Sequence, residues 1–184
     1  VILCVLAELR VFLFSAAFPF FNNVDEQAHF DLVYKYSRGH IPTGLERRDA
    51  DAARTISLYE SPEYFFKPGQ YQEGQPPRFR WPPFVAADKE LERLASASQQ
   101  KLNHESTQPP LYYVVAGVWY RIGEGMGLRD GQALYWTRFL NVLLCGLLTW
   151  LAYGFARRCF PDKSFLRLGV PILVAFFPQD VFFS

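Results

Sequence analysis

Long apolar segments alternate with one long polar segment along the 184 residues of the chain. The apolar segments cover Val1 to Phe21, Pro110 to Ile122, Leu134 to Ala156, and a last stretch that begins near Phe165. A helix of about 20 apolar residues crosses the hydrocarbon core of a bilayer. The pattern therefore predicts membrane-spanning helices at all four places, most clearly at the third, FLNVLLCGLLTWLAYGFA.

Two charged residues, Glu8 and Arg10, interrupt the first apolar segment. Each costs about 2.5–3.5 kcal/mol at the centre of a bilayer on insertion scales. We therefore expect the two side chains to pair with each other, to face other helices, or to lie near a membrane interface.

The polar segment predicts a soluble layer on one face of the membrane, because it is far too long for a simple connection. Asn23 can cap a helix that continues to about Arg38, where Gly39 closes it. This helix is amphipathic and is expected to lie along the membrane surface; a second helix is expected over residues 87–103. The organisation predicted is a first span at 1–21, an extracytoplasmic loop at 22–108, and three further spans in 109–184.

Composition narrows the function classes. The net charge of +1 excludes the basic footprint of a nucleic-acid-binding protein. The number and spacing of Cys4, Cys145 and Cys159 fit neither a disulfide framework nor a zinc site, so they are interpreted as packing residues. Both ends of the chain fall within hydrophobic sequence, and we expect it to be a piece of a longer protein.

Asp25 and Glu26 stand directly after the first apolar segment. The simplest interpretation is an acidic first turn, which a helix dipole favours. A carboxylate at the exit of a span could also act as a general base at the membrane surface. His29 and Glu105 lie in the same polar segment and are candidate substrate-binding residues. No metal-binding motif is present; no resident metal is expected, and a divalent cation is the alternative.

The polar segment ends in NHESTQPPLYYVVAG, residues 103–117, in which Glu105 precedes QPPLYY, and the chain ends in FPQDVFFS. An acidic pair after the first span, a long polar loop and this motif resemble, in that order, the GT-C superfamily of integral-membrane glycosyltransferases. The likeness is to the bacterial branch near the protein O-mannosyltransferase and aminoarabinose transferase families. It extends over essentially the whole chain.

That resemblance implies a mainly α-helical, polytopic transmembrane bundle in a bacterial inner membrane, with a large extracytoplasmic loop that carries amphipathic surface helices. It implies transfer of a hexose or pentose from a polyprenyl-phosphate lipid to an acceptor glycan, lipid or protein at the outer face. The essential aspartate of the first outer loop would be Asp25, with Glu26 beside it. Such enzymes have eight or more spans, so this chain alone is expected to be inactive.

A basic cluster conflicts with the predicted topology. If the loop lies outside and every span crosses, Arg157 and Arg158 also lie outside, although positive residues favour the cytoplasmic face. Either the second span is misjudged, or the two arginines bind the phosphate of the lipid donor.

Two other function classes remain open. One is a non-enzymatic polytopic membrane protein, such as a transporter or an assembly subunit for surface polysaccharide. The nearly apolar third and fourth segments count against a transport path, which requires polar or broken helices. The other is a metal-dependent membrane hydrolase.

Overall fold

The computed structural model describes residues 1–21, 25–60 and 88–177. It is mainly helical, as the sequence predicts, and its chain forms two compact units. The first, here called the apolar unit, comprises Val1–Phe18 and Leu134–Ser184. The second, the inserted unit, comprises Pro19–Ala133. The inserted unit thus extends beyond the predicted loop of residues 22–108.

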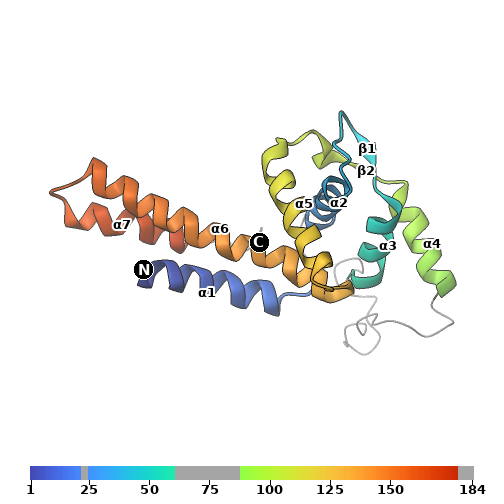
Figure 1. Ribbon diagram of the computed structural model, residues 1–184, viewed down its shortest axis with the longest axis horizontal. Coiled ribbons are helices and arrows are strands. Elements are labelled where there is room, and N and C mark those ends of the chain that lie inside the picture. Colours follow the sequence, from blue (N-terminus) through green and yellow to red (C-terminus); the bar gives the residue numbers. More distant parts are fainter. Residues whose placement is uncertain (22–24, 61–87, 178–184) are drawn as a thin grey trace, which may run out of the picture. The chain divides into compact units, whose positions relative to one another are not determined.

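The apolar unit contains the helices α1 (Ile2–Ala17), α6 (Asp130–Cys159) and α7 (Ser164–Ala175), and α6 begins in the last residues of the inserted unit. The three helices run side by side (Figure 1). Small side chains fill the centre, where Ala7 and Val11 of α1 meet Cys145 of α6 and Ala175 of α7. Leucines such as Leu151 and Leu173 point outward and are exposed, which is typical of helices that face lipid.

Within the described residues, α6 is the one helix that is both long and apolar enough to cross a membrane; α7 is apolar but shorter. The helix expected as the second span is α5 (Pro110–Gly125), which belongs to the inserted unit. A polytopic bundle stays a prediction.

Contacts along α1 and α6 show that the two helices are antiparallel. At one end, the Arg138 guanidinium donates hydrogen bonds to the carbonyl oxygens of Ser15 (2.9 Å) and Phe18 (2.7 Å). Farther along, Glu8 of α1 lies against Gly146 of α6. Since Arg138 takes up carbonyls that the end of α1 leaves without intrahelical partners, it acts as a side-chain cap for that helix.

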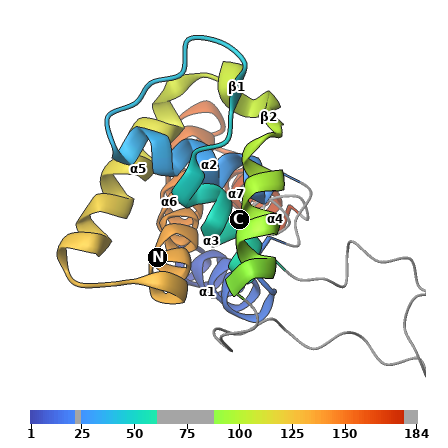
Figure 2. The ribbon, with the colours of Figure 1, turned by 90° about the vertical axis from the view of Figure 1, so that its right-hand side faces the viewer.

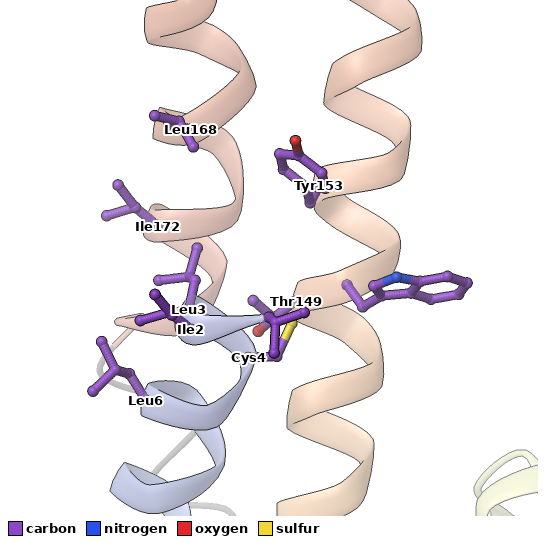
Figure 3. Close-up of a pocket in the computed structure, with 10 residues that line it drawn as sticks. Ile2, Leu3, Cys4, Leu6, Thr149, Tyr153, Leu168 and Ile172 are labelled. Carbon is purple, nitrogen blue, oxygen red and sulfur yellow. The ribbon is translucent and has the colours of Figure 1, made fainter.

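A groove of about 480 Å³ lies between α1, α6 and α7 (Figure 3), and its lining residues fit the same antiparallel arrangement of α1 and α6. Cys4 of α1 and Thr149 of α6 both line the groove, and Leu168 and Ile172 line it from α7. Residues near the start of α1 are therefore level with the second half of α6.

The charged residues of α1 do not pair with each other. Arg10 donates hydrogen bonds to the carbonyl oxygens of Ala175 (2.9 Å) and Phe177 (3.3 Å) at the end of α7. Glu8 packs against Gly146. A Cβ atom at position 146 would overlap the Glu8 carboxylate, so glycine is needed there. Of the three arrangements expected from the sequence, the structure has both residues facing other helices.

In the inserted unit, α2 (Glu26–Ser37) packs between α5 and α3 (Ala50–Tyr59), and α3 packs against α4 (Asp88–Gln99) (Figure 2). The approach of α2 and α5 depends on Gly117, because a Cβ atom there would lie 2.8 Å from the backbone nitrogen of Ser37. Arg38 and Glu124 join the two helices at their C-terminal ends, with a shortest N–O distance of 2.6 Å.

The expectation that α2 is an amphipathic surface helix is wrong. Most of its side chains are buried, including the charged residues Asp31 and Lys35. These two neutralise each other at 3.0 Å, and Lys35 also donates to the Arg47 carbonyl oxygen at 2.6 Å. The polar stripe that the sequence shows is therefore turned into the unit and satisfied there. The helix expected over residues 87–103 is confirmed in part as α4, which ends at Gln99 and whose side chains are partly exposed; residues 102–103 are extended instead.

A short antiparallel pair of strands closes the inserted unit: β1 (Glu46–Arg47) pairs with β2 (Leu102–Asn103), and the 3-10 helix η5 (His104–Thr107) follows. The Asn103 amide is buried and donates hydrogen bonds to Ala28 O (2.8 Å) and Asp31 Oδ2 (2.7 Å) of α2. Asn103 thereby fixes the start of η5 against the first turns of α2.

Candidate functional site

Three residues with titratable side chains meet where α2 and η5 begin: Asp25, His104 and Glu105. His104 Nε2 lies 3.3 Å from Asp25 Oδ1 and 3.4 Å from Glu105 Oε1. The imidazole is exposed, Asp25 is partly exposed and Glu105 is mostly buried. The cluster therefore opens to solvent on the side of the histidine.

Backbone and amide contacts hold this cluster in place. Asp25 is the N-cap residue of α2, and its carbonyl oxygen accepts hydrogen bonds from the backbone of Ala28 (2.9 Å) and His29 (3.0 Å). On the other side, the Asn103 side-chain oxygen accepts from the Glu105 backbone N–H at 3.0 Å. Because Asn103 also binds α2, one buried amide sets the spacing between the two acidic residues.

Glu26 has a different role from its neighbour. Its carboxylate accepts a hydrogen bond from the backbone N–H of Phe21 at 2.6 Å. Phe21 has a φ of 60°, a left-handed conformation that is uncommon for a bulky residue, and its side chain is buried against Phe30. Glu26 thus stabilises the strained turn that leads into α2.

His29 binds a residue of α5 instead of a residue of the acidic cluster. Its Nδ1 lies 2.7 Å from the hydroxyl oxygen of Tyr113, and the two rings are stacked with centroids 6.0 Å apart. Burial raises the pKa of the Tyr113 phenol, and the negative charge of Glu105 raises it further. Tyr113 therefore stays a neutral hydroxyl that is hydrogen-bonded to His29 and lies within the influence of the Glu105 charge.

The arrangement offers two kinds of chemistry. A carboxylate with an adjacent imidazole can accept a proton from a bound hydroxyl and pass it to solvent. The cluster can also hold a divalent cation, because one ligand atom from each of the three residues lies within 4.8 Å of the others. An imidazole nitrogen with two carboxylate oxygens is a ligand set that zinc and similar metals accept.

The structure brings together some of the residues singled out from the sequence and not others. Asp25 and Glu105 meet, although they are far apart in the chain. Glu26 and His29 are adjacent to them but bind Phe21 and Tyr113. Arg157 and Arg158 lie in the apolar unit, exposed at the C-terminal end of α6. The contributions of Asn103 and Tyr113 were missed, and no sequence signal marks them.

The comparison with protein families gives one match. Residues 9–183 match the family described as predicted membrane protein (DUF2142). Since the match covers nearly the whole chain, the protein belongs to this family of membrane proteins, in agreement with the apolar helix α6. No curated protein and no solved structure matches the chain.

Proposed function

We propose that this membrane protein is part of a glycosyltransferase that moves a sugar from a polyprenyl-phosphate lipid to an acceptor at the outer face of a bacterial inner membrane. The observation that carries the proposal is the meeting of Asp25 with Glu105 and His104 just after the first apolar helix. In the resemblance to GT-C enzymes, the essential aspartate of the first outer loop falls on Asp25.

In this proposal Asp25 is the general base. It accepts the proton of the acceptor hydroxyl as that oxygen attacks the anomeric carbon, and the polyprenyl phosphate leaves with the electrons of the broken C–O bond. His104, at 3.3 Å, is suited to relay the proton to solvent, and Glu105 stabilises the imidazolium that results. Glu26 supports the turn that presents Asp25 and takes no direct part.

The substrates are the sugar-bearing lipid and an acceptor glycan, lipid or protein. His29 supplies an imidazole and Tyr113 a hydroxyl near the carboxylates, and such groups hydrogen-bond to sugar hydroxyls. A divalent cation, where one is used, would be held by the three residues of the cluster and would neutralise phosphate charge.

The Asp25→Asn substitution tests the proposal in the full-length protein. Removal of the base should lower sugar transfer at least a hundredfold, because general base catalysis contributes about 10²–10⁴-fold. The measurement is transfer from a panel of synthetic polyprenyl-phosphate sugars to membrane extracts, with Asp51→Asn, an acid of α3, as the matched control.

Near-normal transfer by the purified Asp25→Asn protein would remove Asp25 as the base. Sugar-lipid binding without transfer by the wild type, across the whole panel, would instead favour the non-enzymatic alternative, a transporter or assembly subunit.

A further inference from the structure

The membrane faces reached by the two ends of α6 follow from contacts inside the apolar unit. Arg138 binds the carbonyls of Ser15 and Phe18, so the start of the membrane-length part of α6 is level with the end of α1. The chain therefore enters the inserted unit after Phe18 and leaves it before Leu134 at the same end of the apolar unit.

The chain leaves the apolar unit and returns to it at the same end. The inserted unit between these two points must therefore cross the membrane an even number of times or not at all. In its described part, only α5 was a candidate span, and α5 carries Arg121 and Glu124 and packs along α2. A single crossing by α5 is incompatible with the Arg138 contacts. The described part of the inserted unit, including α5, is therefore assigned to one side of the membrane.

The other end of α6 then reaches the opposite side. Every residue between Arg138 and Arg157 is uncharged. At about 1.5 Å per residue this stretch rises about 28 Å, close to the thickness of the hydrocarbon core. The two arginines thus mark the two interfaces that α6 joins.

The turn between α6 and α7 carries a basic surface, here called the basic corner. It also contains one acidic residue, Asp162. The basic corner consists of four cations: Arg157, Arg158, Lys163 and Arg167. Within the described part of the chain, none of the four side chains has an ion-pair or hydrogen-bond partner. Phe165 is 84% exposed at the same turn, as an aromatic side chain inserted at an interface would be.

We infer that the basic corner is a docking surface for anionic lipid headgroups on the cytoplasmic face, opposite the inserted unit. Unpaired cations beside the end of a membrane helix are attracted to a negatively charged leaflet, and guanidinium binds phosphate oxygens bidentately. The positive-inside tendency is satisfied in this orientation. Arg157 and Arg158 are thereby assigned to lipid on the opposite face from Asp25, rather than to the sugar donor.

Lipid retention tests the inference without reference to any transfer activity. The full-length protein is purified in detergent micelles that contain phosphatidylglycerol and phosphatidylcholine. The lipid that it retains is counted by native mass spectrometry. Replacing the four cations of the basic corner by glutamine should lower the preference for phosphatidylglycerol roughly tenfold or more. Excess inorganic phosphate should not displace the lipid from the wild type.

The inserted unit offers a matched control with three arginines and one lysine, all exposed and replaced by glutamine: Arg47, Arg54, Lys101 and Arg121. This variant should retain phosphatidylglycerol like the wild type. Unchanged preference in the basic-corner variant, or an equal loss in the control, overturns the inference.

Thiol labelling tests the sidedness. In a Cys159→Ser background, Arg54→Cys should react with a membrane-impermeant maleimide in intact spheroplasts, whereas Lys163→Cys should react only after lysis. Labelling of both positions from the same side, or the reverse pattern, overturns the inference. The background variant without an added cysteine measures any reaction of Cys4 and Cys145.

Discussion

In the apolar unit, Arg10 and Arg138 donate hydrogen bonds to backbone carbonyls at helix ends. In the inserted unit, by contrast, Asp31 and Lys35 bind each other and are surrounded by further polar groups. The difference follows from the surroundings of each unit. A helix end among apolar helices has no water to satisfy its last carbonyls, and a long guanidinium can reach them. The inserted unit instead collects several polar groups around one buried pair.

The strongest test of this contrast is Asp31→Asn in the inserted unit. Asp31 is fully buried and binds Lys35, the Asp49 backbone and Asn103, so the neutral variant leaves a buried ammonium without its nearest countercharge. Loss of one partner of a buried pair costs about 3–5 kcal/mol of unfolding free energy. Thermal unfolding of the full chain in detergent measures it, and the exposed Asp162→Asn variant should be unaffected.

A smaller effect is expected in the apolar unit from Arg138→Leu. The variant loses both hydrogen bonds to the end of α1, each worth about 1.5 kcal/mol for a charged donor, so a loss of about 3 kcal/mol is expected. Arg138→Lys keeps a charged donor and should recover part of the loss. Equal stability of the leucine variant and the wild type would show that the end of α1 is satisfied in another way.

Gly146→Ala probes the packing of α1 on α6. The added methyl group would overlap the Glu8 carboxylate, which must then move, at a cost of about 1–3 kcal/mol for overpacking. Gly154→Ala on the same helix meets nothing within 4 Å and serves as the control. Disulfide cross-linking rates between engineered cysteines on the two helices would follow the packing directly.

The smallest effect concerns pH in the inserted unit. The hydrogen bond from His40, at 2.6 Å, lowers the pKa of Glu46 below its usual value of 4.5. A carboxyl group with a lowered folded-state pKa stabilises the fold above pH 4.5, and this contribution is lost as the pH falls through the lowered value. Glu46→Gln should remove about 0.5 kcal/mol of this acid dependence, measured as the difference in melting temperature between pH 6 and pH 3.

Local patterns in the sequence predicted most helices well. The predicted turn at Gly39 is confirmed by its φ of 79°, and α5 begins at Pro110, where the predicted second apolar segment starts. The predicted cap at Asn23 lies outside the described residues, and Asp25 is the N-cap residue in the structure. Periodicity and capping chemistry act within a few residues, so they can be read from the chain.

The burial of α2 and the composition of the acidic cluster were not predicted, because they depend on contacts between residues far apart in the chain. The polar face of α2 looks solvent-facing until Asn103, which follows it by more than 70 residues, supplies a buried amide to Asp31. The meeting of Asp25 with Glu105 depends on the same contact. Helix α3 was also missed, although its signals are local: the side-chain cap of Asp49 and an apolar stripe that includes Ala52 and Ile56.

The Arg138 contacts also affect the entropy of folding. They join residues 120 positions apart, so the inserted unit becomes a closed loop once α1 and α6 have packed. Closing such a loop in a flexible chain costs roughly 4 kcal/mol by a logarithmic length law. Packing of α1 on α6 supplies this closure, so the inserted unit folds from an ensemble that is already restricted. Conversely, cutting the chain within the inserted unit should weaken the coupling between its folding and the association of α1 with α6.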